Sequence, residues 1–149
     1  MLARKSYLVI AKPNSNLLVL LSEYEYKTEA IIDIVLTDVC SEKYRNTLIN
    51  CLGYFSQLNY LRHKFRIFTF DKQLIKQIKE NETSLDLKEK VEVYSAIRLL
   101  NMDLVDIKGN LINLYKYKHV LCVNDDKIEV YTDSTKVNLK VNIHGNDTI

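Results

Sequence analysis

The sequence is poor in the residues that break regular structure. Its 149 residues include three glycines, one proline and no tryptophan. So little glycine and proline argues against a disordered or loop-dominated chain. The same scarcity excludes a glycine-rich phosphate loop, and neither the P-loop pattern nor the dinucleotide-binding pattern occurs. We therefore expect an ordered chain that binds neither ATP nor a dinucleotide and needs no cofactor.

Long hydrophobic runs are also missing. The longest apolar run, Leu17 to Leu21, is far shorter than the roughly 20 residues that cross a bilayer. The basic start of the chain is followed by too few apolar residues for a signal peptide. The three cysteines, Cys40, Cys51 and Cys122, are an odd number without C-x-x-C spacing, which favours neither a disulfide framework nor a zinc site. We expect reduced thiols, a cytoplasmic protein and no membrane contact.

Residues with catalytic or metal-binding spacing are absent as well. The three histidines stand in separate segments, and none has a second ligand three or four residues away. Asp125 and Asp126 could hold a cation, but turn chemistry explains them better. We therefore predict no catalytic residue and no metal site; an enzyme would need a site that these patterns do not reveal.

The chain carries almost balanced charge. Lys and Arg number 21 against 19 Asp and Glu, a formal net charge of +2, so any nucleic-acid contact needs a local patch. The densest basic cluster, from Arg62 to Arg66, is interleaved with aromatic residues, as in many nucleic-acid surfaces. A solvated helix end is the alternative reading. Lys116 and Lys118 would extend such a patch if they pointed the same way. The DNA-binding residues that we predict are Arg62, Lys64, Arg66 and Lys108.

Apolar periodicity predicts helices over most of residues 1–101. A short strand at Tyr7–Ile10 or a docking segment comes first, and helices follow near residues 17–24, 30–39, 41–61 and 72–78. Asp71 or Thr69 can cap the helix near 74–78. A further helix should run from Asp86 to Leu100, where Asp86 and Glu89 form a capping box.

After residue 101 the pattern changes to short β-prone runs. Residues 104–107 and 111–114 flank Lys108-Gly109-Asn110, and residues 119–123 and 127–131 flank a second turn. Strict alternation from Val137 to Ile143 predicts a last strand. We expect one α+β domain over residues 1–149, helical in 1–101 and made of β-hairpins in 102–149. A helix followed by a hairpin indicates a winged-helix core, and this layout excludes βαβ repeats and a parallel nucleotide-binding sheet.

The order of these parts resembles the middle component of bacterial three-component ABC/SMC-type systems, the class that includes the Lamassu-type anti-phage systems. The resemblance covers about residues 17–114. It depends mainly on a stretch that starts at Lys88-Glu89 and ends at a hairpin containing Gly109, with Ala96, Leu100, Leu104-Val105 and Leu111-Ile112 along it.

The resemblance implies a non-catalytic accessory subunit with a winged helix. Its partners would be an SMC/ABC-type ATPase and an effector such as a nuclease, with double-stranded DNA as a further contact. The alternative is a stand-alone winged-helix DNA-binding regulator in which the Asp86 helix or the helix before it enters the major groove. The expected exposed side of the Asp86 helix mixes Lys88, Lys90 and Arg98 with Glu89 and Glu92, whereas a DNA-reading helix would normally be more basic.

Overall fold

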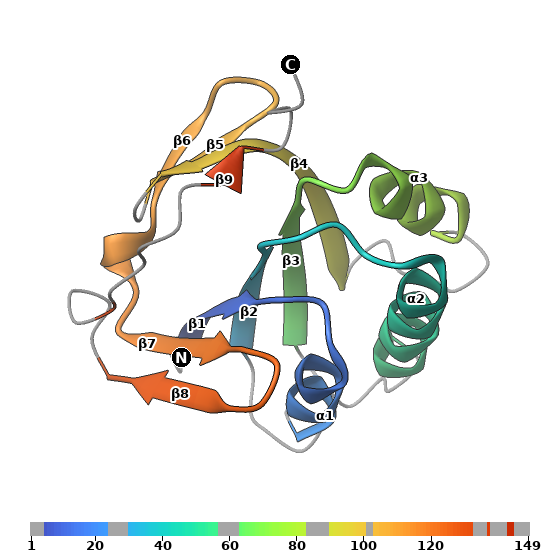
Figure 1. Cartoon of the computed structure of the whole chain (residues 1–149), viewed down its shortest axis with the longest axis horizontal. Helices are drawn as coiled ribbons and strands as arrows, with labels where there is room; N and C mark the ends of the chain where they lie inside the picture. Colours follow the sequence, from blue (N-terminus) through green and yellow to red (C-terminus); the bar gives the residue numbers. More distant parts are fainter. Residues whose placement is uncertain are drawn as a thin grey trace, which may run out of the picture.

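The protein is built around one curled sheet, with helices on its outer side (Figure 1). The computed structural model describes residues 5–23, 30–56, 63–82, 90–100, 103–132, 137 and 143–144. Within them the strands follow the order β6-β5-β4-β3-β2-β1-β7-β8, and β9 pairs with β4. Among these residues no helix is long and apolar enough to cross a membrane.

The first part of the chain alternates strands and helices. Its elements are β1 (Lys5–Ala11), α1 (Ser15–Glu23), β2 (Ala30–Leu36), α2 (Glu42–Ser56), β3 (His63–Thr69), α3 (Lys72–Glu80) and β4 (Val91–Leu100). β1 to β4 are parallel neighbours. Right-handed crossovers that step in one direction place their helices on one face, and Figure 1 shows all three helices there.

The second part adds antiparallel strands at both ends of this sheet. Its elements are β5 (Asp103–Asp106), β6 (Leu111–Asn113), a 3-10 turn (Leu114–Lys116), β7 (His119–Val123), β8 (Ile128–Tyr131) and β9 (Ile143–His144). β5 and β6 continue from β4, whereas β7 returns to pair with β1 in parallel. β8 closes the far end as the antiparallel partner of β7. The sheet therefore curls into a half-barrel.

The predicted fold class is wrong, because the expected helical N-terminal part is a parallel βαβ sheet. Residues 30–36 were expected to be helical, yet they form β2 between β1 and β3. Their near-continuous run of isoleucine and valine is typical of a strand that is buried on both faces. The exclusion of βαβ repeats and of a parallel sheet is wrong for the same reason.

The winged-helix core is also wrong, because Val91–Leu100 is the strand β4. The helix that we expected there had Val91, Tyr94, Ile97 and Leu100 on one apolar face, but the buried positions are Val91, Ala96 and Leu99. β4 pairs with β3 and β5, so sheet partners outweigh a weak helical pattern in a segment with several β-branched residues. The expected capping box at Asp86 and Glu89 lies outside the described residues.

Several local predictions are confirmed. β1, α1 and α2 occupy the expected stretches, and Asp71 caps α3 by accepting from the backbone N–H groups of Gln73 and Leu74. Both hairpins form, and Gly109 has the positive φ of 84° that its turn needs. The strand expected from Val137 to Ile143 is not confirmed as a whole, because Ile143 lies in β9, Val137 lies in no strand, and residues 138–142 are outside the described part.

Side-chain alternation along the strands divides the core in two. The outer core lies between sheet and helices, where the strands contribute alternate residues such as Val9, Ile34 and Ile67. The inner core fills the concave face with the intervening residues, among them Leu8, Val35 and Phe68. A polar residue on the concave face of a central strand is therefore a departure from the pattern, and charged residues of this kind mark the candidate site.

Candidate functional site

A row of charged side chains crosses the concave face. Asp33 on β2 pairs in register with Arg66 on β3, and Arg66 pairs with Glu92 on β4. Each alternates with outer-core residues along its strand, so the three share the concave face. Val35 and Phe68, the next residues on that face of β2 and β3, are apolar. The sheet thus places opposite charges side by side in an otherwise hydrophobic surface.

Asp33 is the most buried residue of this row. It is 1% exposed, and its two carboxylate oxygens accept from Nε and Nη2 of Arg66 at 2.5 and 2.6 Å. The Tyr117 hydroxyl donates a third hydrogen bond to Asp33 Oδ2. Both oxygens of Asp33 are therefore engaged by neighbouring side chains, which leaves the carboxylate poorly suited to act as a general base or a metal ligand.

The same contacts fix the protonation of the two partners. Burial, together with the hydrogen bond to Asp33, raises the pKa of Tyr117 above its ordinary range. The hydrogen bond to Asp33 also raises the pKa of Arg66. At neutral pH, Tyr117 is thus a neutral donor and Arg66 a permanent cation.

A pocket of about 440 Å³ opens beside this network. Its lining comes from the N-terminal parts of β1, β2 and β7, the middle of β2 and β3, and the segment before β7. The lining residues are Ser6, Ile31, Asp33, Arg66, Lys116, Tyr117, Lys118 and His119. Its volume falls in the range of small-molecule sites.

The lining of the pocket is positively charged. Arg66, Lys116 and Lys118 face a single carboxylate, Asp33, which leaves an excess of two positive charges. Lys116 Nζ lies 5.5 Å from the centroid of the Tyr117 ring. Among the described residues, neither lysine has an ion-pair partner, and Nη1 of Arg66 has no acceptor. The pocket therefore offers donors on three cations to an anion.

A second polar cluster lies beside the first on the same face. Lys64 Nζ contacts Glu92 Oε1 at 2.5 Å, and the Tyr94 hydroxyl donates to Glu92 Oε2. The hydrogen bond from Lys64, and next that from Tyr94, lowers the pKa of Glu92. The Tyr94 ring also stacks on Phe68, with the ring centroids 5.0 Å apart. Lys64 is consequently neutralised by a partner of its own.

Three of the four predicted DNA-binding residues lie in the described part of the chain, two on β3 and one in the turn between β5 and β6. Lys64 and Arg66 lie two residues apart on β3, and each is paired with a carboxylate. Lys108 lies in the turn between β5 and β6 and does not line the pocket. Arg62 lies outside the described part of the chain. The structure instead brings Arg66 together with Lys116 and Lys118, and DNA contact stays a prediction.

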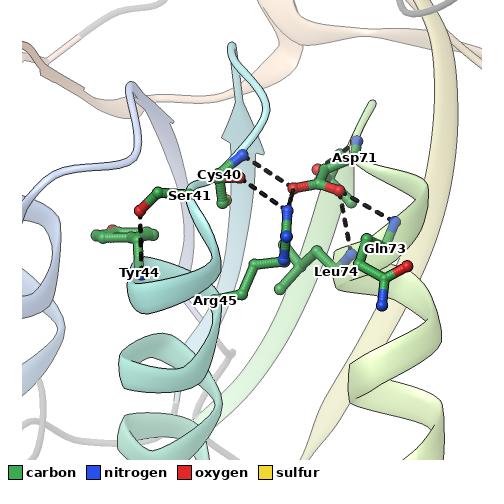
Figure 2. A network of polar contacts seen from close by, with 8 residues as sticks. Cys40, Ser41, Tyr44, Arg45, Asp71, Gln73 and Leu74 are labelled. Atoms are coloured by element: carbon green, nitrogen blue, oxygen red, sulfur yellow. Dashed lines mark hydrogen bonds and ion pairs between the residues drawn. The ribbon is translucent and has the colours of Figure 1, made fainter.

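A different cluster lies beyond the carboxyl ends of β2 and β3. Parallel sheets usually carry their active sites at the carboxyl ends of their strands. Asp71 Oδ2 accepts from the Cys40 backbone N–H at 2.9 Å and from Arg45 Nη1 at 3.1 Å, as Figure 2 shows. Asp71 Oδ1 accepts from the backbone N–H groups of Gln73 and Leu74. Arg45 Nη1 also donates to the Cys40 carbonyl. The cluster therefore joins the β2–α2 connection to the start of α3.

The thiol in that cluster is unsuited to nucleophilic chemistry. Burial is the main reason that the pKa of Cys40 rises to about 12, and the adjacent Asp71 carboxylate adds to it. A thiol with such a pKa is protonated at neutral pH, whereas the thiolate is the reactive form. We therefore interpret the Asp71 cluster as structural, and the concave pocket is the stronger candidate site.

The central residues of the pocket were missed in the sequence. Asp33 interrupts the run Ile31-Ile32-Asp33-Ile34-Val35, and this isolated charge in an apolar stretch was a usable signal. Tyr117 gave no such signal. In the described part of the chain, no group of three or more His, Cys, Asp or Glu side chains could hold a metal ion. Comparisons of the chain with protein-family models, curated proteins and solved structures found no match.

Proposed function

We propose that this protein binds a small anionic ligand in the concave pocket. The observation that carries the proposal is the convergence of Arg66, Lys116 and Lys118 on one pocket whose single carboxylate is already engaged by Arg66 and Tyr117. Hydrogen bonds to charged groups contribute about 1.5–3 kcal/mol each. Two such bonds from this lining would give a ligand both affinity and a fixed orientation.

The lysines supply the part of the site that can be removed with least effect on the fold. Both Lys116 and Lys118 are exposed, and they lie on a short segment outside the sheet. Replacing both by glutamine removes two positive charges and keeps long polar side chains. The matched control is K72Q/K76Q, which removes two exposed lysines from α3 on the helical face.

The test is isothermal titration of three probes that share a hexose ring: glucose 6-phosphate, glucuronate and neutral glucose. We expect at least one anionic probe to bind and glucose not to bind. K116Q/K118Q should weaken anion binding about tenfold or more, whereas K72Q/K76Q should leave it unchanged. The proposal fails if no anion binds, or if the two double variants weaken binding equally.

A role as the non-catalytic accessory subunit of an SMC/ABC-type ATPase and nuclease complex stays a prediction. Its hairpin forms as β5 and β6, but the helix that suggested it is replaced by the strand β4, so an anion pocket is the better supported proposal. Affinity purification of the tagged chain from its native host would test the accessory role. Co-elution of an ATPase and a nuclease would support it, and recovery of the chain without them would contradict it. A winged-helix regulator is not proposed, because the last helix of the expected winged-helix core is the strand β4.

A further inference from the structure

We propose that the anion taken by this pocket is a phosphate monoester on a small organic group, held by Arg66, which Asp33 and Tyr117 fix in position. This inference depends on the proposed function, since it names the class of ligand for the same pocket. It has two parts that the structure supports separately: the direction in which Arg66 can donate and the charge of the lining.

The pairing of Arg66 with Asp33 leaves one edge of the guanidinium free. Asp33 occupies the Nε and Nη2 side through two short hydrogen bonds. The opposite fork is formed by Nη1 and the second hydrogen of Nη2. The hydrogen bonds that Arg66 makes to described residues use Nε and Nη2, so Nη1 is not engaged by them, and the Tyr117 hydroxyl lies close enough to the guanidinium to contribute to its raised pKa. Arginine forks match the paired oxygens of phosphate and carboxylate groups. The free fork is thus a ready donor for an oxyanion in the pocket.

Asp33 and Tyr117 hold that fork in one orientation. Asp33 is buried and is placed by its register between β1 and β3, and the Tyr117 side chain, itself 5% exposed, ties Asp33 to the segment before β7. A cation–π contact at 5.9 Å between Arg66 and Phe68 restrains the guanidinium further. Asp33 contacts Arg66 directly, and Tyr117 contacts Asp33. Both therefore act as positioning residues.

The charge of the lining distinguishes between oxyanions. Three cations and one carboxylate leave two positive charges. A phosphate monoester carries about −1.5 to −2 at neutral pH, whereas a carboxylate or a phosphodiester carries a single negative charge. Of these three groups, the monoester is the one whose charge balances the lining. The pocket volume of about 440 Å³ also leaves room beside the phosphate for an organic group, next to the Ile31 side chain and the Ser6 hydroxyl.

The first experiment compares the same three hexose probes in the wild-type protein. We expect glucose 6-phosphate to bind at least about tenfold more tightly than glucuronate, and glucose to show no binding. Equal affinity for the two anions would overturn the phosphate class and leave the proposed function intact. Binding of neither anion would overturn both.

The second experiment separates positioning from bulk charge. D33N makes the pocket more positive, so simple attraction predicts tighter binding, whereas loss of positioning predicts weaker binding and a smaller preference for glucose 6-phosphate over glucuronate. R66K keeps the charge and removes the fork, and we expect it to lose the same preference. Tighter binding by D33N with the preference kept would overturn the positioning role.

Y117F provides a variant without any change of charge, and it serves where D33N fails to fold. It removes the hydroxyl that donates to Asp33 and should reduce the preference for the phosphate probe severalfold. The matched control is Y131F, which removes a hydroxyl that donates to Glu129 at 2.8 Å outside the pocket. Equal preference in Y117F and Y131F would overturn the role of Tyr117.

Discussion

At the scale of single residues, Asp71 makes the largest set of buried polar contacts that the structure describes around one carboxylate. It is 4% exposed and joins Cys40, Arg45 and the first turn of α3. Removing one partner of a buried charge pair costs about 3–5 kcal/mol, because the other charge is left without compensation. Asp71 is therefore the residue whose loss should most affect the connection between β2 and α2.

We expect D71N to lower the free energy of unfolding by about 3 kcal/mol. We also expect the free energy of unfolding of D71N to change less with pH in the acid range than that of the wild-type protein. Burial favours a higher pKa for Asp71, but hydrogen bonds from Cys40, Leu74 and Arg45 outweigh it and lower the pKa below 3.8. The stabilisation is thus present above pH 3.8 and is lost as pH falls through the lowered pKa. Urea unfolding at several pH values measures both effects.

The control for this prediction is D126N, which changes an exposed aspartate in the turn between β7 and β8. We expect D126N to change stability by less than about 0.5 kcal/mol, as surface substitutions usually do. If D71N and the wild-type protein lost stability equally between pH 5 and pH 2, the Asp71 contacts would not be the source of the acid dependence.

Residue-scale prediction from the sequence succeeded where the interaction was local. The capping role of Asp71 could be predicted because the backbone N–H donors to its carboxylate and the helix start lie within three residues. The Asp33 network could not, because its partners lie 33 and 84 residues away. Nothing local in the sequence indicates that Tyr117 meets Asp33, since only the pairing of β7 with β1 brings them together.

At the scale of elements, the same distinction separates the hairpins from the parallel strands. The two hairpins carry their turn signals between adjacent runs, and both were predicted. β2 and β4 were predicted as helices, because each is a short apolar segment whose strand partners come from other parts of the chain. Periodicity alone does not distinguish a short buried strand from a helix, so the sheet contacts decided the outcome.

The turn between β5 and β6 gives a prediction at this scale. Gly109 has φ of 84°, and a Cβ there would meet nothing within 4 Å. The cost of G109A is therefore backbone strain without a clash, and we expect about 1 kcal/mol of lost stability. G109N should cost less, because asparagine tolerates this conformation.

Thermal or urea unfolding of G109A, G109N and the neighbouring control K108A measures this difference. Lys108 is exposed, and K108A should have an effect below about 0.5 kcal/mol. Similar losses for G109A and K108A would show that the positive φ at Gly109 does not matter for the hairpin.

At the scale of the whole molecule, the half-barrel leaves the sheet with two edges. In the described part of the sheet, β6 and β8 are the end strands, and each has a neighbour on one side only. On β8, Val130 is 70% exposed and Ile128 is 40% exposed. These two residues oppose Leu121 and Val123 of β7, which belong to the outer core. An exposed apolar edge strand is a template for pairing with another chain.

We expect this edge to make the protein associate as its concentration rises. V130K places a charge on β8, and charged edge residues oppose strand pairing, so sedimentation velocity should show a lower average mass for V130K than for the wild-type chain. The control is V19K on α1, where the valine is 56% exposed but presents no strand edge. An equal reduction by both variants would attribute association to exposed valine in general, and a wild-type chain that stays monomeric would contradict the prediction. The difference between the two variants therefore isolates the open edge of the half-barrel from ordinary surface hydrophobicity.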